Sequence, residues 1–139
     1  MSTTTRPEVS VRNKYWIDRH RYYELKHFCL QYPIWKKARL ELEGFSKMPI
    51  NGIPISKTNV ISSPTEKCAE ARLFYSDRIE MIEKTARKTD ESLYNYILRA
   101  VTEGISYNSL RARFNIPCCK ENYYNLYRRF FWLLSIERR

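Results

Sequence analysis

The sequence predicts an all-α protein with about six helices. Three observations indicate this fold class: glycine occurs only three times in 139 residues, long runs of Val, Ile and Thr are missing, and Lys, Arg, Glu and Leu are frequent. A hydrophobic fraction of 43% is that of a globular protein rather than a disordered tail. A chain of this length also buries enough surface to fold without disulfides or metals.

The first helical segment is expected between Asn13 and Tyr32, where the chain has neither Pro nor Gly. Apolar side chains recur there within an arc of about 100°, as on the buried face of a helix. They are Tyr15, Tyr22, Leu25, Cys29 and Tyr32. Pro33 suits the first turn of a second helix, and Gly44 is expected to end it. Residues 1–43 are therefore predicted to form an N-terminal helical hairpin.

Residues 44–62 are predicted to be a long connector, because they hold two glycines and two prolines and so exclude a regular helix. Their Met, Ile and Val side chains are too apolar for a pure spacer. We expect this segment to be the most mobile part of the chain and the easiest for a protease to cleave. Residues 63–139 then form a helical domain.

Helix-start patterns are clearest after the connector. Ser63 and Glu66 have the spacing of a capping box around a proline that fits the first turn, and they predict a helix to about Lys88. Asp90 is expected to cap a shorter helix that Gly104 ends. The inward residues of that shorter helix are expected to be Leu93, Tyr96, Ile97, Ala100 and Val101.

The C-terminal segment 106–134 has the pattern of a helix-turn-helix. Ser106 is placed to cap a short helix, and Asn115 tolerates the left-handed conformation that ends one. The Ile-Pro pair that follows supplies an apolar plug for the turn and prevents the helix from continuing. A longer, basic helix then begins near Cys119 or Lys120.

This last helix sorts into two faces by its 3.6-residue period. The inward face is expected to hold Cys119, Tyr123, Leu126, Tyr127, Phe130, Leu133 and Leu134. The outward face holds Glu121, Asn125, Arg128 and Trp132, with Lys120, Tyr124 and Arg129 on its flanks. Arg and Asn side chains read guanine and adenine edges, whereas Lys and Tyr can hold phosphates. The candidate DNA-binding residues are Tyr107, Arg111, Arg113, Lys120, Glu121, Tyr124, Asn125, Arg128 and Arg129.

The net charge of +10 is unevenly distributed. Residues 104–139 carry seven Lys and Arg against two Asp and Glu, and residues 1–62 carry eleven against five. A surplus concentrated in this way suggests a polyanionic partner, most often nucleic acid, although a merely solvated basic surface is the alternative. No run of about 18 apolar residues occurs, so we expect no membrane span. The start of the chain lacks an apolar signal segment, which favours a cytoplasmic location with reduced cysteines.

Other kinds of site are weaker. Cys118-Cys119 lacks the spacing of a zinc site, and adjacent cysteines rarely bridge. His20, Glu24 and His27 can share one helical face, but no further ligand is apparent. A carboxylate series consists of Glu66, Glu70, Asp77, Glu80 and Glu83. These acids alternate with Lys and Arg on one predicted helix, which is typical of surface ion pairing rather than of a nuclease. We expect no enzyme, no metal and no cofactor.

Beyond these patterns, the chain resembles the phage transcriptional regulators of the RinA/ArpU type. The resemblance lies in the segments RYYELKHFCLQYPIWKKARLEL, ISSPTEKCAEARLFYSDRIEMIEKTA, YNYILRAVTEGISYNSLRARFNIPC and YYNLYRRFFWLL. It covers nearly all of residues 20–136 and is densest from Leu93 to Leu134. It implies a phage or prophage protein that activates late genes for packaging, morphogenesis and lysis. Such a protein binds double-stranded DNA at the late promoter, with host RNA polymerase as a second partner, inside the bacterial host cell.

The C-terminal part is also similar to region 4 of bacterial sigma factors, which reads promoter DNA. The similarity places Ser106, Leu110, Phe114 and Ile116 at the cap and apolar positions of that region's helix-turn-helix. The turn in this chain is one or two residues longer than the minimal form.

Three classes of function remain open at this point. The first is a sequence-specific DNA-binding activator, either monomeric or a homodimer, whose Lys36, Lys37 and Arg39 touch flanking phosphates or polymerase. The second is an interaction protein that rides on RNA polymerase without binding DNA by itself. The third is a small-terminase-like DNA-packaging protein, which also carries a helix-turn-helix and forms large rings. DNA binding without polymerase separates the first from the second, and the particle size identifies the third.

Overall fold

The computed structural model describes residues 13–47 and 62–139. Within these ranges every regular element is a helix, which confirms the predicted fold class. The segments are α1 (Arg19–Leu30), α2 (Tyr32–Lys47), α3 (Ser62–Thr89), α4 (Tyr94–Glu103), α5 (Tyr107–Phe114) and α6 (Lys120–Glu137). Residues 48–61, which make up most of the predicted connector 44–62, lie outside the described residues. No helix in the described ranges is long and apolar enough to cross a membrane.

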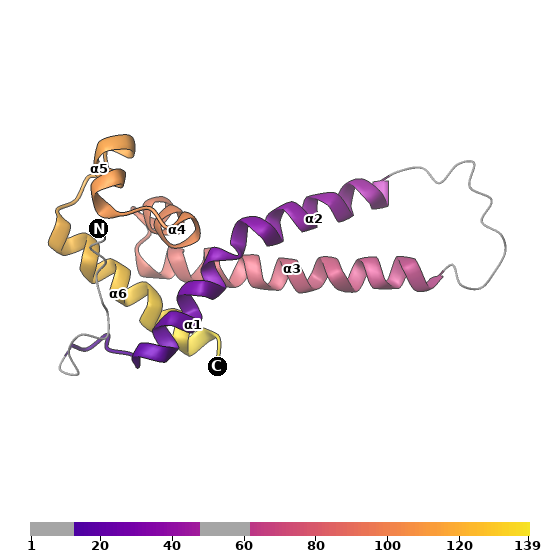
Figure 1. Cartoon of the computed structure of the whole chain (residues 1–139), viewed down its shortest axis with the longest axis horizontal. Helices are drawn as coiled ribbons and strands as arrows, with labels where there is room; N and C mark the ends of the chain where they lie inside the picture. Colours follow the sequence, from indigo (N-terminus) through magenta and orange to yellow (C-terminus); the bar gives the residue numbers. More distant parts are fainter. Residues whose placement is uncertain (1–12, 48–61) are drawn as a thin grey trace.

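The predicted N-terminal hairpin is wrong, because α1 and α2 form one bent helix (Figure 1). Only Gln31 separates them, and its backbone continues the helical hydrogen bonding: its N–H donates to Phe28 and its carbonyl accepts from Trp35. Pro33 is the second residue of α2. In a continuous helix Pro33 cannot donate to the carbonyl of Cys29, and its ring crowds that carbonyl, so the proline bends the helix without reversing it.

Both predicted limits of this bent helix also need correction. The first helix begins at Arg19 rather than near Asn13, because the Asp18 side chain caps it by accepting from the N–H of His20 at 2.9 Å. At the other end α2 continues through Gly44 to Lys47. A single glycine costs a helix only about 1 kcal/mol, which is not enough to end it.

The later helix boundaries agree closely with the sequence patterns. Helix α3 begins at Ser62 and places Pro64 in its first turn, so the prediction that Ser63 caps this helix is wrong: Ser63 is already its second residue. The Asp90 carboxylate accepts from the N–H groups of Ser92 and Leu93 at 2.8 and 2.9 Å, although regular helix starts only after them, in α4. Gly104 ends α4 in the left-handed conformation, with φ of 70°.

The molecule has a compact head and a projecting arm (Figure 1). Helices α2 and the N-terminal half of α3 run antiparallel and form the arm, which reaches away from all other helices. The C-terminal half of α3 passes into the head, where α4 and α6 pack against it and α1 contacts both of them. The bent helix α1–α2 therefore joins the arm to the head.

The core of the head is aromatic. Phe130 and Phe131 of α6 are fully buried, and the Phe131 ring meets Tyr22 of α1 edge-on, with centroids 5.2 Å apart. Ile79 and Ile82 from α3 join the same buried cluster. Burial of Phe130 and Leu134 confirms the predicted inward face of α6, whereas Phe131 was not expected inside and Cys119 is exposed.

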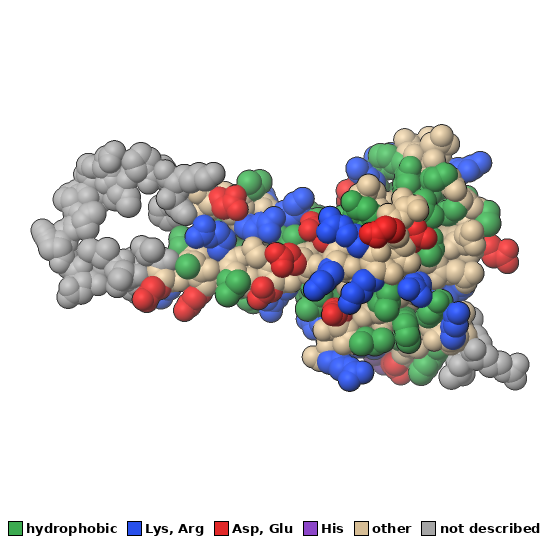
Figure 2. All heavy atoms as spheres, turned by 180° about the vertical axis from the view of Figure 1, so that it is seen from behind, with side chains coloured by type: hydrophobic (Ala, Val, Ile, Leu, Met, Phe, Trp, Pro, Cys, Tyr) green, Lys and Arg blue, Asp and Glu red, His purple; other side chains and the backbone are tan. Residues whose placement is uncertain are grey.

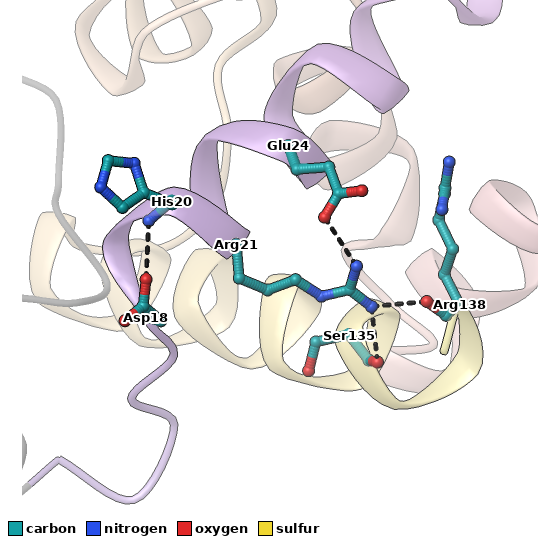
Figure 3. Close-up of polar contacts among 6 residues, drawn as sticks. All are labelled: Asp18, His20, Arg21, Glu24, Ser135 and Arg138. Atoms are coloured by element: carbon teal, nitrogen blue, oxygen red, sulfur yellow. Dashed lines mark hydrogen bonds and ion pairs between the residues drawn. The ribbon is translucent and has the colours of Figure 1, made fainter.

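Arg21 ties α1 to the far end of α6 (Figure 3). Its guanidinium donates to the backbone carbonyls of Ser135 and Arg138, and it pairs with Glu24 at 2.8 Å. The hydrogen bond from Arg21 is the main reason that the pKa of the Glu24 carboxyl is lowered. Carbonyls at a helix C-terminus lack intrahelical partners, so the arginine supplies the donors that the end of α6 needs.

Two tyrosines form a polar contact inside this apolar head. The Tyr22 and Tyr127 hydroxyls lie 2.9 Å apart, between α1 and α6. Burial raises the pKa of Tyr127 well above its ordinary value, and the neighbouring Tyr22 raises it further. The Tyr127 phenol is therefore held in its neutral, hydrogen-bonding form.

We expect Phe130→Ala to lower the free energy of unfolding by about 3–5 kcal/mol, because a fully buried ring is replaced by a cavity. Ile136→Ala is the matched control on the same helix, since Ile136 is exposed and its loss should change stability by less than about 0.5 kcal/mol. Chemical denaturation of both variants measures the difference. Equal losses in the two variants contradict the described face of α6.

Stability should fall as the pH rises above about 10, the pKa of an unfolded tyrosine. The pKa of Tyr127 is higher in the folded than in the unfolded protein. Its contribution to stability is therefore complete below the unfolded pKa and is lost as the pH rises from there toward the folded pKa. Tyr127→Phe should therefore flatten the alkaline part of a stability-against-pH curve. Tyr23→Phe, at an exposed tyrosine, should leave the curve as in the parent, and identical curves for all three proteins contradict the expectation.

Candidate nucleic-acid interface

Helix α5 starts and ends where the sequence places its boundaries. The Ser106 hydroxyl accepts from the N–H of Ser109 at 3.2 Å and caps the helix. Asn115 ends the helix with φ of 53° and ψ of 50°, in the left-handed region. The N–H of Ile116 then reaches back to the carbonyl of Leu110 at 3.4 Å. This closing pattern satisfies a C-terminal carbonyl and reverses the chain direction.

The turn between α5 and α6 is anchored on its inner side. Ile116 and Leu110 are both fully buried, so the predicted apolar plug is confirmed. The Tyr107 hydroxyl donates to the carbonyl of Cys118 at 2.7 Å, and its ring packs on that of Tyr123 with centroids 5.4 Å apart. These contacts join the first residue of α5 to the last part of the turn. The two helices are therefore held in one fixed arrangement.

Exposure changes along α6. Its first residues, Lys120 and Glu121, are exposed, and so is Asn125 one turn later. From Phe130 onward the helix is packed into the head against α3 and α1. The N-terminal turns of α6 are thus open to solvent on their outer side, while the buried Tyr123 holds their inner side against the core. This is the part of a recognition helix that contacts bases in helix-turn-helix proteins.

Four of the candidate DNA-binding residues lie on the outer face of α6, near its N-terminus. Asn125 and Arg128 lie one turn apart, and the Arg128 guanidinium donates to the Asn125 side-chain oxygen at 3.4 Å. Tyr124 is half-buried, and the Lys120 ammonium lies 5.9 Å from the centre of its ring. The amide, guanidinium and ammonium groups supply hydrogen-bond donors of the kind that base edges and phosphates accept.

Cys119 stands just before this face, at the N-cap position of α6. It makes no side-chain hydrogen bond there, so the first N–H groups of the helix have no cap from it. Its neighbour Cys118 is partly buried, and burial is the main reason that the pKa of this thiol is raised. All four cysteines in the described residues are free. No group of three or more His, Cys, Asp or Glu side chains in those residues could hold a metal.

The arginines of α5 lie beside the turn. Arg111 is exposed and its guanidinium donates to the carbonyl of Ile116 at 3.4 Å. Arg113 is exposed and lies 5.0 Å from the centre of the Phe114 ring, which Arg99 of α4 approaches from 4.4 Å. Arg99 was not among the candidates, because its helix looks like core in the sequence. Only the folded chain brings it next to α5.

Two of the predicted DNA-binding residues, Arg129 and Tyr107, instead form hydrogen bonds to other parts of the protein. The Arg129 guanidinium donates to the Tyr15 hydroxyl at 3.3 Å and to the carbonyl of Lys88 at 3.4 Å. The hydrogen bond from Arg129 is the first cause of the lowered pKa of Tyr15. Tyr107 is engaged with the turn through its hydroxyl. Both residues hold the framework together, whereas Lys120, Glu121, Asn125 and Arg128 are turned outward.

Comparison with known proteins adds no relative. No family model matches the chain, and neither the curated proteins nor the solved structures contain a match.

We expect Asn115→Ala to lower the free energy of unfolding by about 1 kcal/mol, since alanine is strained in the left-handed conformation. Asn115→Gly should be neutral or slightly stabilising, because glycine adopts this conformation freely. The control is Ala112→Gly, at an exposed position inside α5, where glycine should cost about 1 kcal/mol. Denaturation curves of the three variants test whether residue 115 has the left-handed conformation. A lower free energy of unfolding for Asn115→Gly than for the parent contradicts that conformation.

Proposed function

We propose that this protein is a sequence-specific DNA-binding transcriptional activator of phage late genes. In this proposal α5 and α6 are the two helices of a helix-turn-helix, and the N-terminal turns of α6 enter the major groove of the late promoter. The observation that carries the proposal is the outer face of the N-terminal turns of α6, where Lys120, Asn125 and Arg128 face outward on a helix whose opposite face is buried. The resemblance to the RinA/ArpU-type regulators supplies the biological setting.

The groups at the start of α6 suit a duplex in two ways. Asn125 and Arg128 have the side chains that bind adenine and guanine edges with paired hydrogen bonds. Lys120 and the uncapped N–H groups of the first turn suit a phosphate, which helix N-termini attract. Arg111 and Arg113 extend the positive charge along α5. The helix that precedes a recognition helix normally crosses the DNA backbone, where these charges are useful.

Host RNA polymerase is the expected second partner of such an activator. The proposal requires that DNA binding does not depend on polymerase. Footprinting of the purified protein on the late promoter, with and without polymerase, tests this requirement. Protection that appears only with polymerase favours the interaction-protein alternative and contradicts direct recognition.

Binding should also weaken steeply with salt. Each phosphate neutralised by Lys or Arg releases counterions, which gives a slope of about −0.9 per phosphate in a plot of log binding constant against log salt. We expect Arg128→Ala to weaken binding to the promoter by about 1–3 kcal/mol, with an unchanged melting temperature. Lys120→Ala should weaken promoter and unrelated DNA equally and reduce the salt slope by about one phosphate.

Lys67→Ala is the matched control for this experiment, because Lys67 is exposed on α3 in the arm, away from α5 and α6. Gel shifts at several salt concentrations, with melting curves of each variant, provide the readout. A binding constant that stays flat between low and physiological salt contradicts DNA as the main ligand. Loss of stability in Arg128→Ala contradicts its placement on the outer face.

A further inference from the structure

The outer surface of the arm carries both exposed apolar side chains and many charged ones. Of the seven exposed large apolar side chains in the described residues, four lie on α2 and α3. Leu40 and Leu73 are the most exposed of the arm's leucines, at 65% and 62%. Each lies away from the other helix of the pair: Leu40 is about 140° around α2 from the buried Trp35, and Leu73 about 120° around α3 from the buried Ile79.

Charge of opposite sign surrounds the two leucines. Lys36 and Lys37 are exposed near Leu40 on α2. The Lys36 ammonium lies 5.3 Å from the centre of the Tyr32 ring, at the edge of α2 that borders a groove with α4. The exposed acids of α3 in the arm are Glu66, Glu70, Asp77 and Glu80. Figure 2 shows acidic side chains along the free edge of α3, and basic side chains together with an acidic group over α2. The exposed charges beside Leu40 are therefore two lysines with one acid, Glu41, and those beside Leu73 are four acids with one lysine, Lys67.

Among the described side chains of the arm, these charges have no ion-pair partner. The ion pairs found in the described ranges join Arg21 to Glu24, Lys88 to Glu137 and Arg99 to Glu103, all in the head. Two hydrogen bonds cross the arm instead, from Tyr32 to Glu83 and from Arg39 to Ser76 at 3.4 Å.

The same two hydrogen bonds define which residues of the antiparallel pair lie level. Tyr32 of α2 is level with Glu83 of α3, and Arg39 of α2 is level with Ser76 of α3. From the first pair to the second, α2 advances by seven residues while α3 runs back by seven. By this register Leu40 and Leu73 lie within about 3 Å of the same height along the arm. Lys37 is likewise level with Asp77, and Lys36 with Glu80, each to within about 1.5 Å.

We propose that the arm binds a second copy of this chain, with the outer face of α2 on one copy seated against the outer face of α3 on the next. Placing two arms side by side at the same height brings Leu40 against Leu73. It also brings Lys36 and Lys37 opposite Glu80 and Asp77. The facing helices run antiparallel, as α2 and α3 do within one arm. The leucine contact removes apolar surface from water, and the charge pairs fix the height.

Charge also decides the symmetry of this contact. A two-fold symmetric dimer through either face places like charges together, which is unfavourable. The complementary contact joins two different faces and is head-to-tail, so two copies do not complete it. Assembly therefore continues to a ring or an open chain. The alternative function of a small-terminase-like DNA-packaging protein also requires a ring. The measured particle size therefore helps to decide between that function and a transcriptional activator.

Analytical ultracentrifugation of the full chain tests the proposal. At low salt we expect concentration-dependent assembly beyond a dimer, weakening in molar salt because screening there acts within about 3 Å. A monomer at every concentration, or an assembly that stops at two copies, overturns the proposal. DNA binding is measured separately on the same samples, so failure of the arm contact and failure of the proposed function remain distinguishable.

Charge reversal gives the decisive comparison. We expect Lys36→Glu with Lys37→Glu, and separately Asp77→Lys with Glu80→Lys, to weaken assembly by about tenfold or more each. An equimolar mixture of the two double variants should assemble again, because each then offers the face that the other needs. Any contact that joins α2 of one copy to α3 of another behaves in this way, and the sedimentation experiment separates a ring or chain from a dimer. Assembly of either variant alone at the parent's strength, or a mixture that stays monomeric, overturns the proposal.

The matched control is Arg19→Glu with Arg139→Glu, which changes the net charge by the same amount as the lysine variant. Both arginines are exposed and lie outside the arm. This control should assemble as the parent does, and weakened assembly in it would mean that net charge rather than the arm is responsible. Circular dichroism confirms that each variant is folded. Leu73→Ser removes the apolar contact without changing charge and should weaken assembly in the same direction.

Discussion

Phe130 and Phe131 are fully buried where α6 packs against α3 and α1, and the arrangement of the head depends on that contact. It holds the C-terminal half of α6 in place, and the buried Tyr123 holds the inner side of the N-terminal turns, whose outer side stays open to solvent. The short helix α5 and its turn are then attached from the other side, through Ile116 and Tyr107. A helix that is half core and half surface joins stability to recognition, because its outward residues are only as well placed as its buried ones are well packed.

The parts of the fold that depend on short-range chemistry could be predicted from the sequence. Ser106 as a cap, Asn115 in the left-handed conformation and Ile116 as a buried plug each follow from one residue and its immediate neighbours. The inward position of Phe130 follows from helical periodicity. Phe131 does not, since it lies about 100° from Phe130 and is buried because α6 is covered by more than one helix.

The remaining differences come from contacts between distant residues. Arg129 is an outward or flanking cation on a helical wheel, but its partners are Tyr15 and Lys88, far away in the chain. Arg99 belongs to a helix whose pattern is that of core, yet it reaches the aromatic end of α5. Pro33 causes the bend between α1 and α2, but the direction in which α2 leaves it depends on packing against α3. No local pattern contains this information, because the partner in each pair is chosen only when the helices meet.

The link from Arg21 to the end of α6 spans 114 and 117 residues of sequence. During synthesis α1 emerges long before α6, so the face of α1 that carries Tyr22 has no α6 to cover it until residues 120–137 have been made. The head therefore assembles late, and its closing step joins two distant parts of the chain. Such non-local closure slows folding relative to a bundle of sequential helical hairpins. It leaves an aromatic helix face exposed on the growing chain, of the kind that chaperones protect from aggregation.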